Sequence, residues 1–422
     1  MLKKVKVKAR AMIRSEARQA IEEVQATFEN NMRQIIREEL SSASTNSTAP
    51  DLSSVRKQLQ QAISENNPDK AKSILSRFAK DKRESNASYV EEARKMRLDL
   101  YRTENKEDYK DAIKVLFNAH TFSDFTRDQF ADVYHFRFPV TQASSMFQQF
   151  VRRRRMKQVG DVPDRWLVKS KKEGEEFAQM VDVLCPKSQY NIPFDQIPRM
   201  TDIVVKPMAS AGSKGVFMVR ALDDILSLED HTKLNSWDEM REQVQTMLKN
   251  KRISEDAFVY QQCIYSSNTT KEPAHDLKFY SFYGEVGAVL EIARYPEKAF
   301  WWWTPDGQLI EIEAVNPACM KPEGFTPEML QTAIDLSLKI PSPFMRLDFM
   351  RNEDKLYLSE FCSSPGAGGA RTLGRYYPKW DRIFGDMYLK AEMRIINDLL
   401  AGKRFDEINE FNRICDKRYR NK

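Results

Sequence analysis

The 422-residue chain has no run of about 18 apolar residues, and this absence argues against a membrane-spanning helix. Its N-terminus is basic from the first turn and lacks the apolar segment of a secretory signal, so we expect a cytoplasmic protein. The chain has only five cysteines, without the CxxC spacing of a structural zinc site. Their wide separation favours reduced thiols over a disulfide framework. They are Cys185, Cys263, Cys319, Cys362 and Cys415.

The net charge is also low for a chain of this length, at +6. The positive excess is concentrated in the first twenty residues and in the run from Arg152 to Arg155. Neither run has interleaved aromatic residues or a recognisable nucleic-acid module, so we expect no nucleic-acid partner. The N-terminal run could contact an anionic membrane surface as a peripheral helix, and the alternative is a solvated helix face.

The first 130 residues have helical patterns throughout. Residues 1–40 are expected to form a basic amphipathic helix with a coiled-coil seam, which predicts a homo-oligomer or docking onto the chain's own body. Residues 41–51 have the composition of a flexible linker, and residues 52–130 of a small helical domain. The seam consists of Ile13, Ala17, Ala20, Val24, Phe28, Asn31 and Ile35.

Beyond residue 130 the composition changes to short β-rich runs with helical stretches between them. Runs such as "DIVVKPM" and "LKFYSFY" alternate with stretches such as "SWDEMREQVQTMLKN". Closely spaced strands favour antiparallel pairing, so the sequence predicts an α+β body.

The segment "DIVVKPMASAGSKGVFMV" has the pattern of a β-hairpin, with Lys206 at the end of its first strand. Small and hydroxyl residues in its loop would allow a phosphate chain to approach the backbone closely. It is not a GxxxxGK[ST] loop, because a strand and not a helix follows it. An ordinary glycine-containing hairpin is the alternative. The loop residues in question are Ser210, Gly212, Ser213, Lys214 and Gly215.

Charged residues also interrupt three apolar β-runs further along the chain. Asp276 and Lys278 are two positions apart and therefore share one strand face, as a cross-strand ion pair or as part of a nucleotide site. In "MRLDFMRNEDKLYLSEF", Arg346 and Asp348 share a face, and Glu360 follows on the expected partner strand. Charges on an apolar sheet are costly unless they are paired or bind a ligand. Two carboxylates holding Mg²⁺ beside an arginine would satisfy that requirement, and a structural Arg/Asp pair is the alternative.

Taken in order, these segments resemble the ATP-grasp superfamily. The ending "RLDF…LYLSEFCSSPG" is similar to the [RK]-x-D-F…E-x-N-x-x-PG pattern of D-alanine:D-alanine ligase-like enzymes. The segments "DLKFYSFYGE" and "VVKP…GSKG" resemble more closely the TupA-like branch, which acts in teichuronopeptide biosynthesis. The resemblance covers about Asp161 to Leu400. It departs from the pattern at Cys362, where the family has Asn, and at Gln261, where the hinge usually has Glu.

The resemblance implies a pre-ATP-grasp subdomain at 131–200, a catalytic core at 201–400 and a basic helical tail at 401–422. It implies that Lys206, Lys278 and Arg346 are catalytic, that Asp348 and Glu360 hold Mg²⁺, and that Asp276 belongs to the ATP site. The 210–215 loop would close over ATP. The hinge residues around adenine would be Gln261, Gln262, Cys263 and Ile264. Candidates for an anionic substrate are Arg294, Arg371 and Arg375.

The implied reaction joins a carboxylate to an amine through an acylphosphate, with ATP as the phosphoryl donor. Within the branch, the expected substrates are a sugar acid or polymer and an amino acid, in surface-polysaccharide synthesis. The aromatic run from Phe300 to Trp303 could stack on a sugar or cover the core as a strand edge. The alternatives are a non-catalytic scaffold assembled through the coiled coil, and a phosphotransferase on the same fold. The four histidines, His120, His135, His231 and His275, lack the context of a Ser/His/Asp set.

Overall fold

The computed structural model describes residues 52–65, 67–102, 110–125, 127–160, 170–209, 213–267, 269, 271–311, 319–363 and 378–420. The coiled coil and linker predicted for residues 1–51 lie outside these ranges. The chain divides between Ala131 and Asp132 into two compact units. Among the described residues, no helix is both long and apolar enough to cross a lipid bilayer.

The first unit is helical. The helix α3 is 34 residues long, and Asn67 caps its start by accepting the Lys70 N–H at 2.9 Å. The amide of Asn86 on α3 donates to Asp124 in η1 at 2.9 Å, which ties the two elements together. The elements are α2 (Leu52–Ser64), α3 (Pro68–Tyr101), α4 (Lys110–Ala119), η1 (Phe122–Asp124) and α5 (Arg127–Phe136), which crosses the division.

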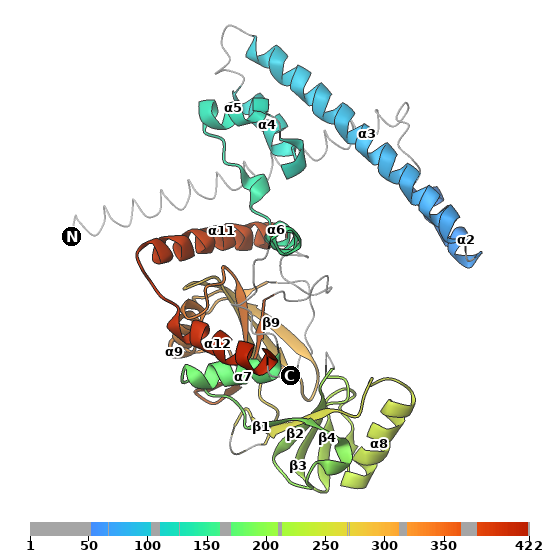
Figure 1. The fold of residues 1–422 in the computed structure, drawn as a ribbon, viewed down its shortest axis with the longest axis vertical. Helices are drawn as coiled ribbons and strands as arrows, with labels where there is room; N and C mark the ends of the chain where they lie inside the picture. Colours follow the sequence, from blue (N-terminus) through green and yellow to red (C-terminus); the bar gives the residue numbers. More distant parts are fainter. Residues whose placement is uncertain are drawn as a thin grey trace, which may run out of the picture. The chain divides into compact units, whose positions relative to one another are not determined.

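The second unit contains two six-stranded antiparallel sheets (Figure 1). The first has the order β1-β6-β2-β3-β4-β5, and α8 (Trp237–Lys249) packs on one face. Trp237, Met240 and Val244 lie at helical spacing on the buried side of α8, which is why this helix docks there. The strands are β1 (Ser188–Ile192), β2 (Ile203–Pro207), β3 (Phe217–Ala221), β4 (Asp224–Ser227), β5 (Lys233–Leu234) and β6 (Phe258–Gln262), and η3 (Phe194–Gln196) follows β1.

The second sheet has the order β10-β9-β8-β7-β11-β12. The hairpin expected from residues 345–362 is confirmed as β11 and β12. The strands are β7 (Asp276–Ser281), β8 (Val286–Ala293), β9 (Ala299–Trp303), β10 (Leu309–Ile310), β11 (Met345–Asn352) and β12 (Lys355–Cys362).

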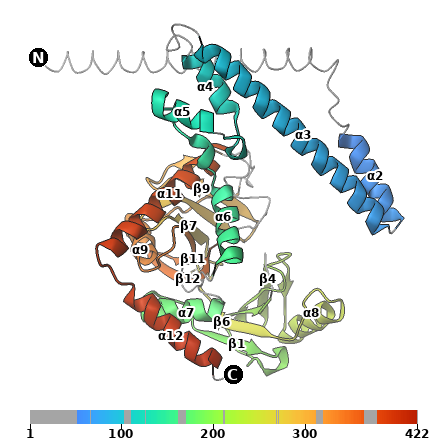
Figure 2. The same cartoon turned by 45° about the horizontal axis from the view of Figure 1, so that its top comes forward.

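Helices cover both faces of the second sheet. On one face, α7 (Lys171–Met180), α9 (Pro327–Leu338) and α12 (Asp406–Arg420) bury residues such as Phe279 and Phe361. On the other, α11 (Pro378–Leu400) packs Phe384 against Tyr280, and α6 (Met146–Val159) lies beside α11 (Figure 2). Gly385 on α11 allows the backbone at Ser144, next to η2 (Thr141–Ala143), to approach so closely that a Cβ would lie 1.9 Å from its carbonyl oxygen.

A buried carboxylate lies on the face of the second sheet that α9 covers. Glu291 on β8 is fully buried and accepts hydrogen bonds from His275 (2.7 Å), Trp303 (2.9 Å) and the backbone N–H groups of Glu323 and Gly324. Burial alone lowers the pKa of His275, but its hydrogen bond to Glu291 and the charges of the nearby carboxylates outweigh this and raise it. The network ties the segment before α9 to the sheet. The aromatic run covers the core, because Trp301 and Trp302 are buried.

Candidate functional site

Three charged residues form a row across neighbouring strands of the second sheet. Lys278 on β7 pairs in register with Asp348 on β11, and Asp348 pairs with Glu360 on β12. The register shifts after this point, so that Ser359 is the extra residue of a β-bulge. Because cross-strand partners share a face, all three side chains lie on the same side of the sheet. Bulges of this kind commonly re-aim side chains near active sites.

Asp348 is neutralised from two directions. Arg346 donates to both of its carboxylate oxygens, at 2.6 and 2.7 Å, and Lys278 forms an ion pair with Oδ2. Only 3% of Asp348 is exposed, and a carboxylate this buried requires such partners. Burial alone would lower the pKa of Arg346, but the adjacent Asp348 charge outweighs it and raises that pKa. Arg346, Lys278 and Asp348, which we call the cationic trio, therefore carry one net positive charge together.

Lys206 on β2 belongs to the first sheet, on the face opposite α8. Its strand neighbours Ile203 and Val205 pack into the α8 core, so Val204 and Lys206 project the other way. The ammonium group is half-buried and makes no hydrogen bond or ion pair within the described residues. Burial and, next, the charge of Lys171 lower the pKa of Lys206 to about 7, against the opposing charges of Glu360, Asp276 and Glu175.

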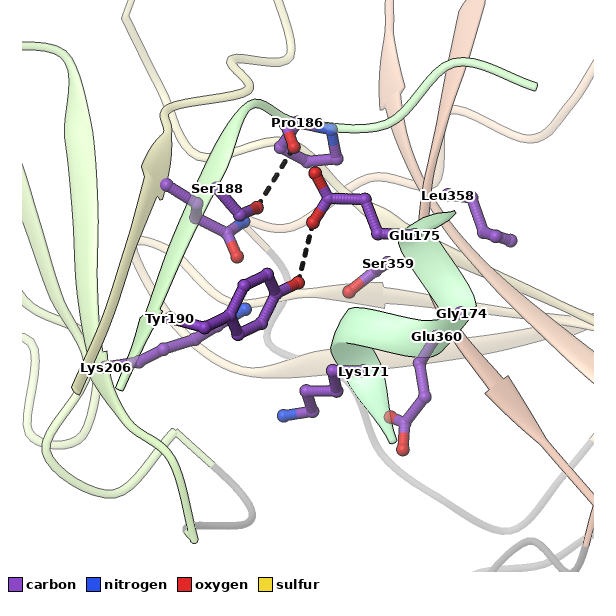
Figure 3. A pocket seen from close by; sticks show the side chains of 11 residues that line it. Lys171, Gly174, Glu175, Pro186, Ser188, Tyr190, Lys206, Leu358, Ser359 and Glu360 are labelled. Atoms are coloured by element: carbon purple, nitrogen blue, oxygen red, sulfur yellow. Dashed lines mark hydrogen bonds between the residues drawn. The ribbon is translucent and has the colours of Figure 1, made fainter. Parts of the chain in front are cut away.

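A narrow pocket joins Lys206 to the charged row. Lys171 and Glu175 reach it from α7, Tyr190 from β1 and Glu360 from β12 (Figure 3). The pocket is a narrow slot with room for about one water molecule. Other lining residues are Gly174, Pro186, Ser188, Gln261, Leu358 and Ser359.

Sequence reasoning missed Lys171, Glu175 and Tyr190. Lys171 and Glu175 are four residues apart on α7, so they share one helix face. That spacing was the only available signal, and it is common on solvated helices. The position of α7 against β12, which brings this face to the pocket, is a tertiary contact that the sequence does not reveal.

Arg294, predicted to bind an anionic substrate, is engaged within the protein. It binds Asp276 through Nε at 2.9 Å and through Nη2, and it donates from Nη1 to the Ser213 hydroxyl at 2.8 Å. Burial raises the pKa of Asp276, but Arg294 and Lys278 outweigh burial and lower it. In the same loop, Lys214 is exposed, and Gly215 has φ +64°, a conformation that favours glycine.

The predicted hinge lies at the end of β6, and several of its backbone groups already have partners. The N–H groups of Gln262 and Cys263 donate to Lys187 and Asp202, and the Ile264 carbonyl accepts from Ala274. Next to the hinge, an apolar patch lines the face of the first sheet that carries Lys206. This patch consists of Met218, Leu226 and Cys263, with Val204, Leu228, Tyr265 and Tyr295 packed against them.

Four predicted site residues lie outside the described ranges: Ser210, Gly212, Arg371 and Arg375. Of the charged and pocket-lining residues among the others, two groups stand apart. Lys206, Gln261 and Glu360 line the pocket, whereas Asp276, Lys278, Arg346 and Asp348 form ion pairs on the neighbouring sheet face.

The donor set suits phosphate better than a metal ion. An unpaired, half-buried lysine and a cationic trio favour a polyanion. The described residues contain no group of three His, Cys, Asp or Glu side chains that could hold a metal by themselves, although Mg²⁺ at a nucleotide needs only one or two carboxylates beside the phosphates. Asp348 and Glu360 face each other across the hairpin, but Asp348 is occupied by two cations. Cys362 has a thiol, a poor ligand for Mg²⁺.

A sequence model of the TupA-like ATP-grasp family matches residues 149–389. No curated protein matches the chain. Among solved structures, it is similar to D-alanine–D-alanine ligase from Bacillus anthracis complexed with ATP, with 15% identity and a TM-score of 0.33 over 55% of this chain and 68% of that one. It is also similar to an L-amino acid ligase from Bacillus licheniformis, with 14% identity and a TM-score of 0.28.

The alignment with the L-amino acid ligase covers 48% of this chain and 42% of that protein. Macrocyclase MdnC from Microcystis aeruginosa MRC, bound with precursor peptide MdnA, shares 11% identity at a TM-score of 0.28, over 52% of this chain and 60% of that one. This chain thus spans less than two thirds of both proteins. Because the family match covers more than half of the chain, the protein belongs to the TupA-like ATP-grasp family and has its α+β fold.

Proposed function

We propose that the protein is an ATP-dependent carboxylate–amine ligase. One observation carries the proposal: Lys206 is half-buried beside a pocket without any hydrogen-bond or ion-pair partner in the described part of the chain. Leaving a buried ammonium group unpaired is costly, so such a lysine is typical of a site completed by an anionic ligand. Membership of an ATP-grasp family makes a nucleotide phosphate the most suitable anion.

Three lysines would then hold the phosphates. Lys206 approaches from the first sheet, Lys278 from the second and Lys171 from the first turn of α7. The α7 N-terminus also favours negative charge. Met218 and Cys263 themselves are buried, but the partly buried members of this apolar patch, Val204, Leu228 and Tyr295, offer apolar atoms against which a purine ring could pack. The hinge residues Gln261 to Ile264 and the 210–215 loop stay predictions for the adenine and phosphate contacts.

ATP would supply the phosphoryl group that activates the substrate carboxylate. The residues of the chain would position and neutralise the reactants. Arg346, held rigidly by both oxygens of Asp348, presents a fixed positive charge next to the row. A preorganised charge of this kind stabilises the negative charge that develops at an attacked carbonyl.

The solved relatives include a D-alanine–D-alanine ligase and an L-amino acid ligase, which support an amino acid as the amine or the carboxylate. A sugar acid as the partner substrate, in surface-polysaccharide synthesis, rests on the resemblance to the TupA-like branch. Arg371 and Arg375 remain candidates for its carboxylate. A non-catalytic scaffold is the second candidate function, and the engagement of Asp348 by two cations favours it.

Nucleotide binding by calorimetry tests the proposal. We expect the folded protein to bind Mg-ATP, and Lys206→Ala to weaken binding by at least about tenfold, because a charge-assisted hydrogen bond contributes about 1.5–3 kcal/mol. The matched control is Lys249→Ala, which removes an exposed lysine at the end of α8 and should leave affinity unchanged. Absence of binding by folded wild-type protein would overturn the ligase and leave the scaffold.

A further inference from the structure

The phosphate pocket contains a carboxylate that the proposed function does not use. Glu175 lies one turn after Lys171 on α7 and lines the same pocket as Lys206. A carboxylate at this place repels phosphate and competes with it for the lysines. Neither lysine forms an ion pair with Glu175 in the described structure, although their charges act on one another.

Other donors hold the Glu175 carboxylate instead. The Tyr190 hydroxyl donates to Oε2 at 2.7 Å, and the Gln179 amide donates to Oε1 at 3.3 Å. The shorter bond crosses from β1 to α7 and is drawn in Figure 3. Tyr190 is itself half-buried, and burial together with the hydrogen bond from its hydroxyl to Glu175 raises its pKa, so it stays a donor throughout the neutral range.

We infer that Tyr190 is a positioning residue that holds Glu175 away from Lys206, and so keeps the lysine available for a phosphate. The inference rests on the proposed nucleotide site and adds a residue to it. Without the hydroxyl, the freed carboxylate oxygen could pair with Lys171 or Lys206, the two lysines that line the same pocket. Ion pairing would then protonate Lys206 and occupy it.

The test compares Tyr190→Phe with Tyr190→Phe/Glu175→Gln. In the nucleotide-free protein, competitive acetylation with mass-spectrometric readout should show Lys206 about two- to tenfold less reactive in the single variant, because a nearby opposite charge shifts a pKa by about one unit or more. The double variant should recover wild-type reactivity, since glutamine cannot form the ion pair. The affinity for Mg-ATP should likewise fall in Tyr190→Phe and return to the wild-type value in the double variant.

Tyr260→Phe is the matched control. It removes a tyrosine hydroxyl from β6, on the α8 side of the same sheet, and should change neither readout. The inference is overturned if Lys206 reactivity is unchanged in Tyr190→Phe, or if the second substitution fails to restore it. Acetylation needs no nucleotide. Thus, a protein that shows the reactivity pattern but binds no ATP refutes the proposed function alone.

Discussion

The lowered pKa of Lys206 leads to a quantitative prediction about proton uptake. With a pKa of about 7, this lysine is mostly neutral at pH 8 in the free protein. A bound phosphate favours the ammonium form and restores the pKa toward its ordinary value of 10.5. Nucleotide binding should therefore take up about 0.9 protons at pH 8, about 0.5 at pH 7 and about 0.1 at pH 6.

Calorimetry in two buffers of different ionisation enthalpy measures this uptake directly. Lys206→Arg supplies the control, because arginine stays charged at every pH in the range, so its uptake should be near zero at pH 8. Lys249→Ala should take up as many protons as the wild type. Binding without proton uptake at pH 8, or equal uptake by Lys206→Arg, would show that Lys206 is not the group that takes up the proton.

The same shift affects stability. Because the folded-state pKa lies below the unfolded one, unfolding takes up a proton between about pH 7 and 10.5, and stability falls as the pH falls through this window. Lys206→Met should therefore raise the Tm at pH 7. That gain should disappear above about pH 10.5, where both states of the wild type become neutral at this position.

Three further predictions concern the frame of the site. Gly385→Ala should destabilise the protein by about 3 kcal/mol or more in chemical denaturation, because its Cβ would lie 1.9 Å from the Ser144 carbonyl oxygen. Glu291→Gln should destabilise it most below pH 6.5, and the difference from wild type should shrink as the pH rises through the raised pKa of His275, as pH-dependent denaturation would show. Arg346→Lys should lower turnover about tenfold or more with a smaller effect on Mg-ATP affinity in steady-state assays, since lysine cannot reproduce the two bonds to one carboxylate.

Alternating patterns in the sequence predicted much of the second sheet. In "MRLDFMRNEDKLYLSEF", the alternation fixed which residues share a face, and the polar turn fixed the hairpin. The sharing of one face by Arg346, Asp348 and Glu360 was therefore predictable. The Arg346–Asp348 pair was one of the two alternatives, but the Lys278–Asp348 pair was not predictable, because alternation carries no information about which cation on β7 lies opposite Asp348.

The missed residues depend on contacts between distant segments. Lys171 and Glu175 belong to a short polar helix whose sequence resembles any solvated helix, and only its packing on β12 brings them to Lys206. Arg294 was predicted to face substrate, and it follows β8 at a position that the register places beside Asp276. Strand pairing between segments 18 residues apart determined that contact.

The most direct test of the ligase is ADP formation measured while an amino acid and uronic acids are added separately and together. We expect ADP release to require both a carboxylate and an amine, an amide product to appear in equal amount by mass spectrometry, and Lys206→Ala to abolish both. ADP release that needs neither partner, or a stable phosphorylated product without an amide, would contradict it.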